Sequence, residues 1–356
     1  MKEKYAGIYK ELVEAYYKGK FEKTFEKILN QDFKNQNVDH KEAKEILAVL
    51  CDVEVDTNVD DHTYIQSIIQ GITSQRVRSR VVQKVKSCGD SCEKVDGKGK
   101  CQTVCPFDAI IDTENGMDKW IDPDLCLSCG RCVEACDTGN LIDTKEGIPV
   151  LELLKEGQKV VAIVAPAIAG QFGADVTLDQ LREAFIKVGF EDMIEVAVAA
   201  DVLSIKEALE FDHHVQDSND FMITSCCCPM WVAALKRVYN KLVPNVSPSV
   251  SPMIAMARIV KAINPNVKVV FVGPCIAKKS EAKESDLVGD VDYVLTFQET
   301  KIIFDALQID PSKCKGVPSV DYAATGGRLY ARTGGVSEAV WDIVDQLLPK
   351  KRELFT

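Results

Sequence analysis

The stretch CLSCGRCVEAC, residues 126–136, spaces four cysteines with two, two and three residues between them. Runs of this kind bind iron–sulfur clusters: three of the cysteines hold one cluster, and the fourth holds a second cluster nearby. Another set of four cysteines lies upstream in residues 88–105, with three, eight and three residues between them. CPFDAI follows that set as CDTGNLI follows the later one, so the two sets form an internal pseudo-repeat. We therefore expect residues 87–150 to form one small domain with two clusters.

The fourth cysteine of each set is expected to cross over to the cluster of the other set. One cluster is then held by Cys88, Cys92, Cys101 and Cys136, and the other by Cys126, Cys129, Cys132 and Cys105. The long gap in the first set, KVDGKGK at residues 94–100, is expected to form a turn on the surface.

Zinc sites and disulfides are the alternatives for so many cysteines. Zinc sites prefer paired Cys-x2-Cys elements, often with histidine, whereas three-cysteine runs dominate here and no histidine lies near them in the sequence. The spacing favours iron–sulfur clusters over zinc. The segment resembles the bacterial-type ferredoxins that carry two 4Fe–4S clusters, and this resemblance implies a role in electron transfer.

The composition limits the class of protein. The chain has 356 residues, 46% of them hydrophobic, and a mean hydropathy near zero, so two or three globular domains are expected. A net charge of -11 argues against a nucleic-acid partner, because such proteins carry a basic surface. The sequence shows neither an apolar run of membrane-spanning length nor a signal-peptide core at its start. Tightly grouped metal-ligand cysteines favour a reducing compartment, and we expect a cytoplasmic protein without a membrane partner.

Residues 1–86 are polar and have helical periodicity. FEKTFEKILNQDF (21–33) and HKEAKEILAVLC (40–51) place apolar residues three and four apart among charges, which predicts amphipathic helices. QRVRSRVVQKVK (75–86) is basic and helix-like. A solvated helix face is its ordinary interpretation, and docking of an acidic electron carrier is the alternative.

Residues 157–356 predict an α/β domain with a largely parallel sheet, because short apolar runs alternate with helical patterns. One helix is well marked: Thr177 is its expected N-cap, Gln180 completes a capping box, and Gly189 ends it. Ligands of such sheets gather at the carboxyl ends of the strands.

Three predicted strands of this domain end in unusual sequence. VVAIV runs into Ala-Pro-Ala at 165–167, FMIT runs into three cysteines at 226–228, and VVFVG runs into Pro-Cys at 274–275. We expect these three strand ends to converge on a site.

The residues at these strand ends resemble those of the iron-only (FeFe) hydrogenases. That family has motifs of the type TSCCPxW and PCxxKxxE, and the chain has SCCCPMW at 225–231 and PCIAKKSE at 274–281. Further similarity covers Ala-Pro-Ala at 165–167, GFEDMIEVAVAADVLSIKEALE at 189–210, Ser-Pro at 251–252 and Thr-Gly-Gly-Val at 333–336. The resemblance implies a hydrogenase-type α/β domain over 157–356.

The resemblance also implies roles for individual residues. Cys228 and Cys275 take the places of ligands to the 4Fe–4S part of the hydrogen-activating cluster, and Cys227 takes the place of the thiol that passes protons to the diiron part. Lys278 is implied to donate to a cyanide ligand of the diiron unit. The implied proton route comprises Cys227, Glu281, Ser251, Glu207 and Glu210, and the implied pocket lining comprises Pro166, Ala167, Ser225 and Pro274. From the residues alone, Glu207 and Glu210 form a solvated helix face, and Cys51 and Cys314 are buried apolar thiols.

Two features depart from the family pattern. Gly273 stands where catalytic members often have a methionine. In this departure the chain resembles the divergent branches with sensory roles. The third family motif, ExxxCxxGCxxGGG, is absent, and Cys314 is the one cysteine that follows Cys275. We expect a catalytic domain that is truncated, or one that a second polypeptide with the missing motif completes.

Two functions follow from these observations. The first is an FeFe-hydrogenase-like protein that reduces protons, oxidises hydrogen or senses hydrogen, with electrons passing through two 4Fe–4S clusters from a carrier such as ferredoxin. A completed assembly would add a third 4Fe–4S cluster with a diiron subcluster, the H-cluster, and only then is enzymatic activity expected. The second is an iron–sulfur electron-transfer or regulatory protein that has lost hydrogen chemistry.

Overall fold

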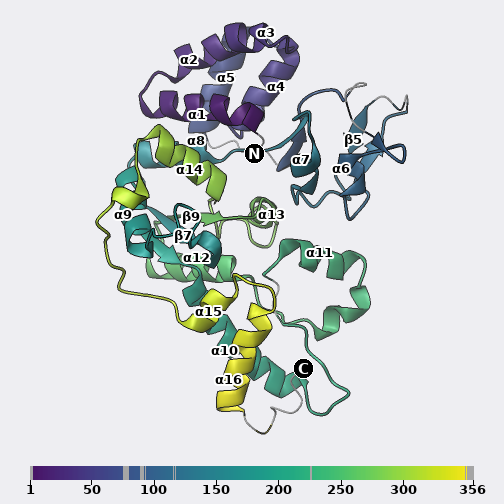
Figure 1. The fold of residues 1–356 in the computed structure, drawn as a ribbon, viewed down its shortest axis with the longest axis vertical. Helices are drawn as coiled ribbons and strands as arrows, with labels where there is room; N and C mark the ends of the chain where they lie inside the picture. The colour runs from purple at the N-terminus through teal and green to yellow at the C-terminus, as the bar shows by residue number, and fades with distance from the viewer. Residues whose placement is uncertain are drawn as a thin grey trace. The chain divides into compact units, whose positions relative to one another are not determined.

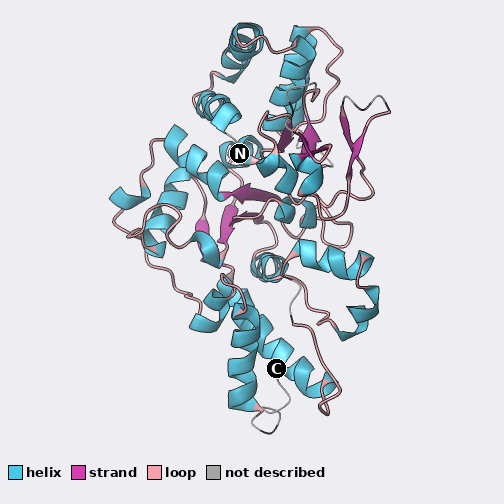
Figure 2. Cartoon of the chain, turned by 45° about the vertical axis from the view of Figure 1, so that its right-hand side comes forward, coloured by secondary structure: helices cyan, strands magenta, loops and turns pink. Residues whose placement is uncertain are grey.

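Helices make up most of the secondary structure, and the strands are short (Figure 2). The computed structural model describes residues 3–74, 80–88, 92, 94–114, 116, 118–224, 227–348 and 350. The chain divides into two units. The first comprises Met1–Gly157, Cys275–Lys283 and Gln298–Ile309, and the second comprises Gln158–Pro274, Glu284–Phe297 and Asp310–Thr356.

The first unit begins with helices, coloured purple in Figure 1. They are α1 (Glu3–Tyr17), α2 (Phe21–Lys27), α3 (Phe33–Asn35), α4 (His40–Leu50) and α5 (Asp61–Thr73). The helices predicted at 21–33 and 40–51 are confirmed, with a π-helical turn (Ile28–Asp32) between α2 and α3. The side chain of Asp39 caps α4 by accepting hydrogen bonds from the backbone N–H groups of Lys41 and Glu42 at 2.9 and 3.1 Å.

The cysteine-rich part of the first unit contains three small antiparallel pairs, β1–β6, β2–β3 and β4–β5. Its elements are β1 (Val82–Lys84), β2 (Lys94–Val95), β3 (Lys98–Gly99), α6 (Lys100–Thr103), β4 (Ile110–Asp112), β5 (Lys119–Ile121), α7 (Arg131–Ala135) and β6 (Leu141–Asp143). The surface turn predicted at 94–100 is confirmed as the β2–β3 hairpin.

The helix-like interpretation of residues 75–86 is wrong for the part that forms β1. Residues 75–79 lie outside the described residues. Val82, Gln83 and Lys84 pair with Asp143, Ile142 and Leu141 of β6. A partner strand from the far end of the domain buries Val82 on one face, so long-range pairing overrides the local pattern.

Three further helices complete the first unit: α8 (Gly147–Lys155), α13 (Ala277–Glu281) and α14 (Phe297–Ala306), whose first residue belongs to the second unit. The backbone N–H of Gly147, at the start of α8, donates to the hydroxyl of Tyr9 on α1 at 3.0 Å. A Cβ at residue 147 would lie 2.3 Å from that hydroxyl oxygen, so close packing of α8 on α1 requires glycine there.

The second unit is built on a parallel sheet in the order β10–β9–β7–β8, which confirms the predicted α/β class. The strands are β7 (Val160–Val164), β8 (Asp192–Glu195), β9 (Lys268–Gly273) and β10 (Tyr293–Thr296). All five residues of β7 are buried, as expected for the strand between β9 and β8. The carboxyl ends of β7 and β9 therefore lie side by side (Figure 1).

The helices of the second unit are α9 (Leu178–Val188), α10 (Ala197–His214), α11 (Pro229–Arg237), α12 (Pro252–Ile263), α15 (Thr325–Leu329) and α16 (Gly335–Leu347). Single 3-10 turns cover Pro166–Ile168, Asn240–Asn245 and Pro311–Lys313. The capping box of Thr177 and Gln180 and the stop at Gly189 are confirmed for α9. Helices α10, α15 and α16 pack against one another.

The strand predicted at FMIT, residues 221–224, is absent from the sheet. Ile223 instead forms a single bridge with Val246. Pro244 and Pro248 flank the partner segment and lack the N–H groups that a longer ladder would need. The expectation that three strands of the sheet converge is therefore wrong. The carboxyl ends of β7 and β9 lie side by side, whereas the segment before the cysteines at 226–228 is irregular chain outside the sheet.

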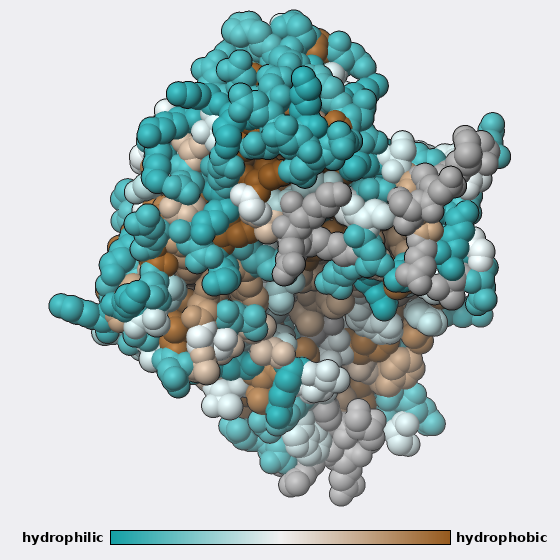
Figure 3. Space-filling model, turned by 45° about the horizontal axis from the view of Figure 1, so that its top comes forward, coloured by the Kyte–Doolittle hydropathy of each residue, from teal (hydrophilic) through white to brown (hydrophobic). Residues whose placement is uncertain are grey.

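The surface of the N-terminal helical region is mainly polar. The outer side of the N-terminal helices is largely hydrophilic in Figure 3. Among the described residues, no helix has both the length and the apolar composition needed to cross a bilayer.

Candidate functional site

Four cysteines of the first unit surround one cavity. Cys105, Cys126, Cys129 and Cys132 all line it, and most of its remaining wall is apolar, with Val82, Phe107, Ile110, Ile121, Leu125 and Leu127. Burial raises the pKa of the Cys132 thiol, and the neighbouring thiols of Cys126, Cys129 and Cys105 raise it further. Four thiols converging on an apolar hollow form the donor set of a 4Fe–4S cluster, so these residues fit that group.

The other four cysteines of this domain, Cys88, Cys92, Cys101 and Cys136, are called the first cysteine group, because they begin earlier in the chain, and the four that line the cavity are called the second group. Burial raises the pKa of Cys101, and Cys92 and Cys136 act on it in the same direction. Asn140 connects Cys136 to the segment of Cys88. Its backbone N–H donates to Cys136 Sγ at 3.2 Å, and its side-chain amide donates to the carbonyl oxygen of Ser87 at 3.0 Å. The structure therefore brings together each of the two crossed sets of cysteines.

Backbone N–H groups point at several of these sulfur atoms. Ala109 donates to Cys105 Sγ at 3.3 Å, and Ser128 donates to Cys126 Sγ at 3.4 Å. Hydrogen bonds to cysteine sulfur atoms are among the factors that set the potential of a bound cluster.

Cys88 has a carboxylate beside it. Asp118 accepts a hydrogen bond from the Cys88 backbone N–H at 3.0 Å and is ion-paired with Lys84. Burial raises the pKa of the Cys88 thiol to about 11, with Asp118 acting in the same direction. The first cysteine group is therefore in a more charged environment than the apolar hollow of the second group.

The β2–β3 hairpin lies directly against the first group. Asp96 and Gly97 at its tip have φ angles of 50° and 78°, the left-handed pair that a two-residue hairpin turn requires. A Cβ at Gly99 would lie 3.5 Å from Cys101 Sγ and 3.6 Å from Cys92 Sγ. Glycine therefore lets the hairpin backbone approach both thiols without a side chain between them.

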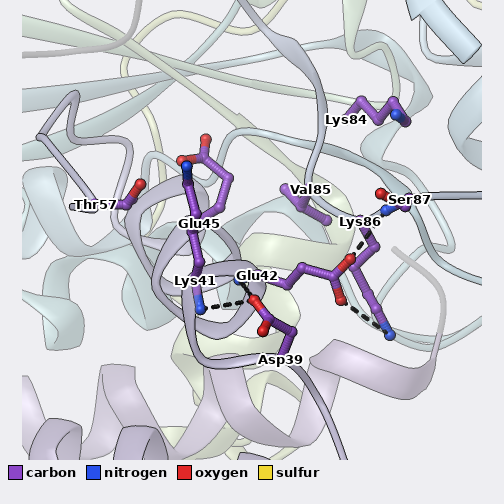
Figure 4. Close-up of a pocket in the computed structure, with 9 residues that line it drawn as sticks. All are labelled: Asp39, Lys41, Glu42, Glu45, Thr57, Lys84, Val85, Lys86 and Ser87. Carbon is purple, nitrogen blue, oxygen red and sulfur yellow. Dashed lines mark hydrogen bonds and ion pairs between the residues drawn. The ribbon is translucent and has the colours of Figure 1, made fainter.

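A polar pocket lies next to Cys88 and is lined by Ser87, Val85 and Thr57 together with six charged residues (Figure 4). These are Asp39, Glu42, Glu45, Lys41, Lys84 and Lys86, three of each sign. Glu42 lies between the Ser87 backbone N–H, which donates to it at 3.0 Å, and Lys86, at 3.9 Å. The charges in this pocket offset one another.

The loop of the apolar cysteine group contacts the segment that contains Cys275. Gly130, between Cys129 and Cys132, has φ 79°, and a Cβ there would lie 2.5 Å from Ile276 Cδ1. Ile276 is the next residue after Cys275 and belongs to the same unit as Gly130. Within this unit, the apolar cysteine group is thus the one nearer to Cys275.

Helix α13 carries two of the proposed site residues. The Nζ atom of Lys278 donates to Glu281 Oε2 at 2.6 Å, and the two residues are 8% and 7% exposed. A buried pair at this spacing holds both side chains on one face of the short helix. Lys278 and Glu281, given separate roles from the sequence, are direct partners.

Lys279, the next residue, anchors α13 in the core of the first unit. It is fully buried, and its Nζ donates to Glu299 Oε2 at 2.8 Å and to the carbonyl oxygen of Thr144 at 2.6 Å. Asp143 lies 3.5 Å away. Burial alone would lower the pKa of Lys279, but the carboxylates of Glu299 and Asp143 raise it above its ordinary value. The lysine is therefore charged and fixes α13 to β6 and α14.

The strand ends of the second unit hold Pro166, Ala167 and Pro274. Pro166 and Ala167 form the 3-10 turn after β7, and Pro274 follows β9 directly. A Cβ at Gly273 would lie 2.5 Å from the ring of Phe271 and 3.3 Å from Ala165 Cβ. The ring of Phe271 thus occupies the space that a methionine at position 273 would need.

The triple cysteine leads into α11. Cys228 is the N-cap of this helix, Pro229 is its first residue, and the Cys228 side chain is exposed whereas Cys227 is half-buried. Ser225 and Cys226 lie outside the described residues. The two described cysteines therefore differ in exposure.

Tyr330 lies within electrostatic range of Cys227 and Glu207 in the second unit. Burial raises the pKa of the Tyr330 hydroxyl, and both Glu207 and Cys227 raise it further. Ser204, one turn before Glu207 on α10, lies 3.1 Å from the Tyr330 hydroxyl and donates its own proton to the Ala200 carbonyl. The Tyr330 hydroxyl is thus hydrogen-bonded to Ser204. Sequence reasoning missed Tyr330, although it lies three residues before the Thr-Gly-Gly-Val stretch that it singled out.

Glu210 and Ser251 have different surroundings. Glu210 accepts a hydrogen bond from Ser247 Oγ at 2.6 Å and is ion-paired with Lys206. Ser251 is the N-cap of α12, where its hydroxyl accepts from the backbone N–H of Ile254 at 3.4 Å. The serine that contacts a glutamate of the predicted route is thus Ser247. Ser247 is one of three serines in VSPSVSP, residues 246–252, and the repeated pattern does not single it out.

Comparison with known families supports both parts of this description. Residues 158–354 match the family described as the iron-only hydrogenase large subunit, C-terminal domain, and residues 119–141 match a 4Fe-4S binding domain. An apo [FeFe]-hydrogenase structure from Chlamydomonas reinhardtii is 27% identical, with a TM-score of 0.42, and the match covers 51% of this chain and 53% of that chain.

Three curated relatives resemble longer stretches of the chain. The NADP-reducing hydrogenase subunit HndD of Solidesulfovibrio fructosivorans is 30% identical over 67% of this chain and 47% of its own length. Iron hydrogenase 1 of Clostridium pasteurianum is 28% identical over 82% of this chain and 66% of its own length. A probable cytosolic Fe-S cluster assembly factor of Drosophila melanogaster is 26% identical over 71% and 57%. The chain thus spans about half to two thirds of the length of these relatives.

Proposed function

The chain belongs to the iron-only hydrogenase family, and we propose that it links one-electron transfer through two 4Fe–4S clusters to hydrogen chemistry. That chemistry is reversible proton reduction and hydrogen oxidation, or hydrogen sensing. The single observation that carries the proposal is the contact of Gly130 with Ile276, because it joins the apolar cysteine group to the segment of Cys275, Lys278 and Glu281.

The ferredoxin-like domain supplies the electron-transfer part. Clusters bound by its two cysteine groups accept and release single electrons at potentials set by charge, hydrogen bonds and exposure. The N–H groups of Ala109 and Ser128 donate hydrogen bonds to the sulfur atoms of Cys105 and Cys126, and apolar side chains line the cavity of the second group. An electron carrier is the partner that such a domain needs, and ferredoxin is our specific proposal.

The hydrogen-site residues are proposed from the family motifs. Cys228 and Cys275 would ligate the 4Fe–4S part of the H-cluster, Cys227 would transfer protons, and Lys278 would hold a cyanide ligand. Pro166, Ala167, Ser225 and Pro274 would line the pocket, with Ser225 outside the described residues. The exposed Cys228 and the half-buried Cys227 support this division of roles.

The proton route is proposed to leave Cys227 along α10. Glu207 is buried and acts on the same tyrosine as Cys227. Glu210 lies one turn further along α10 and contacts Ser247 and Lys206, which connects it to the half-exposed side of the helix. Carboxylates and hydroxyls in sequence are suitable groups for proton relay. Glu281 and Ser251 remain proposed members, with the contacts described above.

A second polypeptide is proposed to supply further ligands. A 4Fe–4S cluster takes four thiolates, and Cys228 and Cys275 provide two. Helix α10 exposes an apolar stripe of Val202, Ile205 and Leu209, which are 55%, 44% and 52% exposed. Their spacing of three and four residues places them on one helix face, and an exposed apolar face of this kind supports a protein partner.

Hydrogen turnover is the direct test. The chain, purified anaerobically with its clusters, would be mixed with a synthetic diiron complex and dithionite, with and without a polypeptide that carries the CxxGC motif. Gas chromatography should detect hydrogen only when that polypeptide is present, and Cys227→Ala should abolish it while the iron content is unchanged. Cys228→Ala should instead lower the iron content. Absence of hydrogen in every combination would contradict the hydrogen chemistry.

An iron–sulfur protein without hydrogen chemistry is the second candidate. The likeness to the cytosolic Fe-S cluster assembly factor favours it. The surroundings of Cys314 favour it as well: the side chain is buried, its Sγ lies 3.4 Å from Lys187 Nζ, and no glycine-rich ligand motif surrounds it in the sequence. For this function, electron uptake from a carrier should persist although no hydrogen forms under any condition above. Stopped-flow absorbance of cluster reduction would measure that uptake.

A further inference from the structure

We propose that Cys314 and Lys187 of the second unit form a covalent sulfur–nitrogen cross-link when hydrogen peroxide oxidises the Cys314 thiol. Neither residue belongs to the cluster ligands or to the proton route described above. The inference is independent of hydrogen chemistry, and it assigns a redox-modification site to a cysteine that the family motifs leave without a role.

A charged amine lies directly beside the Cys314 thiol. Lys187, in the last turn of α9, donates a hydrogen bond from Nζ to Cys314 Sγ at 3.4 Å. Cys314 is 5% exposed, whereas the Lys187 side chain is 48% exposed. A buried cysteine ordinarily behaves as an unreactive apolar residue, so the neighbouring amine sets this one apart. The half-exposed lysine side chain connects the buried sulfur to solvent.

Glu183 holds the amine in this position and is placed to accept its proton. One of its carboxylate oxygens contacts Lys187 Nζ at 2.6 Å, and the other accepts a hydrogen bond from the backbone N–H of Gly316 at 2.7 Å. Glu183, and then Cys314, raise the pKa of Lys187 above its ordinary value, so the lysine is an ammonium before the reaction. A carboxylate at this distance is the base that the ammonium needs to become a nucleophile.

The reaction has two steps, and peroxide is its oxidant. First, peroxide transfers one oxygen to sulfur: the O–O bond breaks, sulfur loses two electrons, and a sulfenic acid and one water form. Second, the Lys187 nitrogen attacks the sulfur, the S–O bond breaks, and the hydroxyl leaves as water, because sulfenic acids condense with nitrogen to sulfenamides. Of the two protons that the ammonium loses, one leaves with that hydroxyl and the other passes to Glu183 and then to solvent.

The cross-link would join two segments that already pack against each other. Residues 310–322, which lead towards α15, are fastened to the first turn of α9. The backbone N–H of Val317 donates to the carbonyl oxygen of Asp179 at 3.0 Å, and the Tyr322 hydroxyl donates to Asp179 Oδ1 at 2.7 Å. Because the backbone is anchored there, the sulfur and the amine stay neighbours, and bond formation requires only a short movement of the flexible lysine side chain.

A second lysine beside the thiol provides an internal comparison. Lys313 precedes Cys314 in the chain, but its side chain is 82% exposed and its Nζ pairs with Asp310 at 2.9 Å. Proximity in the sequence favours Lys313 as the partner of an oxidised Cys314. The structure favours Lys187, which is 127 residues away in the chain.

The test treats the full chain, purified anaerobically with its clusters, with a small excess of hydrogen peroxide and then blocks free thiols with iodoacetamide. Mass spectrometry of proteolytic peptides should find the peptides of Lys187 and Cys314 joined, lighter than their sum by two hydrogen atoms, and separate again after reduction with dithiothreitol. We expect Lys187→Arg to lower the yield of the joined product at least about tenfold, because a guanidinium keeps the charge but stays protonated. Lys313→Arg, the matched control, should keep the wild-type yield.

The wild-type peptides alone decide the site, so the test does not depend on the folding of a variant. Circular dichroism and iron analysis before oxidation establish that each variant is folded and holds its clusters. Cys314 recovered as the alkylated thiol, in a disulfide, or as sulfinic or sulfonic acid without a joined peptide would overturn the proposal. A joined peptide that contains Lys313 in place of Lys187, or an equal yield from Lys187→Arg and wild type, would overturn it as well.

Discussion

At the scale of single residues, Cys88 differs from the other cluster cysteines because a carboxylate lies beside it. Asp118 bonds its backbone N–H at 3.0 Å and pairs with Lys84, whereas the second cysteine group is surrounded by apolar side chains. Cluster potentials respond to nearby charge and to exposure. The two clusters should therefore differ in potential although their ligands are the same.

Asp118→Asn is expected to raise the midpoint potential of one cluster. Removal of a negative charge stabilises the reduced form, and the Lys84 cation that remains acts in the same direction. The shift should be on the order of 50 mV, about 1 kcal/mol for one electron. EPR-monitored redox titration measures it, and Asp122→Asn, near the other cluster, is the control. A shift in both clusters, or in neither, would contradict the assignment of Asp118 to Cys88.

Tyr330 is a second residue whose role can be tested. Its hydroxyl reaches Ser204 at 3.1 Å and lies near Cys227 and Glu207. Tyr330→Phe removes one hydrogen bond at a cost of about 1 kcal/mol, and we expect the pH profile of hydrogen turnover in the completed assembly to change while the iron content stays constant. Tyr322→Phe, at an exposed tyrosine, should leave the profile unchanged. An unchanged profile in both variants would remove Tyr330 from the site.

At the scale of elements, α13 owes its position to buried charge. Lys279 contacts Glu299 on α14 and Thr144 after β6, and Lys283 lies 3.3 Å from Glu146. Charges removed from water are tolerated only when they are paired. The network therefore fixes the short helix that carries Lys278 and Glu281.

Lys279→Met is expected to destabilise the first unit by about 3–5 kcal/mol, because it leaves the Glu299 and Asp143 carboxylates buried without their cation. Anaerobic urea unfolding followed by circular dichroism measures the loss. Lys301→Met, at a lysine on α14 that is 67% exposed, should cost no more than about 0.5 kcal/mol. Adding Glu299→Gln to Lys279→Met should restore part of the stability, and equal midpoints for Lys279→Met and wild type would refute the network.

Helix α15 offers a matched pair of glycines. A Cβ at Gly327 would lie 2.0 Å from the Ala197 carbonyl oxygen, whereas one at Gly326 meets nothing nearer than 3.5 Å. Gly327→Ala should therefore displace α15 from α10 at a cost of about 1–3 kcal/mol, while Gly326→Ala should be neutral or stabilising. Hydrogen–deuterium exchange of residues 325–347 should quicken in the first variant alone. Equal exchange in the two variants would show that α15 packs differently.

At the scale of the whole molecule, the two units divide the chemistry between them. The first contains the eight ferredoxin-type cysteines and also Cys275, and the second contains Cys227, Cys228 and the α10 glutamates. Cys275 is separated from the eight ferredoxin-type cysteines by more than a hundred residues of the chain. Within the first unit, the contact of Gly130 with Ile276 therefore joins residues that lie far apart in the chain.

The full chain should bind about eight iron atoms in its ferredoxin-like domain as two 4Fe–4S clusters. Cys105→Ala and Cys132→Ala should each remove about four irons and the same EPR signal, because both residues line one cavity. Cys101→Ala should remove the other signal. Iron analysis with low-temperature EPR provides both readouts. Zinc in place of iron, or loss of different signals in the two cavity variants, would contradict the crossed arrangement.

The sequence by itself determined the features that depend on residues close together in the chain. The cysteine spacing predicted two clusters and their crossed ligands, the KVDGKGK insert predicted a surface turn, and Thr177, Gln180 and Gly189 predicted the limits of α9. Local rules suffice for the hairpin turn and the helix caps, because both involve neighbouring residues. The crossed cluster ligands join more distant cysteines and were predicted from a recurring spacing pattern. The two hydrogenase motifs likewise lie within short stretches.

Only the tertiary structure decided the features that depend on distant partners. Val82–Lys84 became a strand because β6 pairs with it, and residues 221–224 stayed out of the sheet because prolines flank their partner. The burial of Lys279, the approach of Tyr330 to Cys227, and Ser247 as the partner of Glu210 each join residues far apart in the chain. Contacts between residues this far apart determine whether a side chain is buried and what it pairs with, and the spacing of residues in the sequence does not predict those contacts.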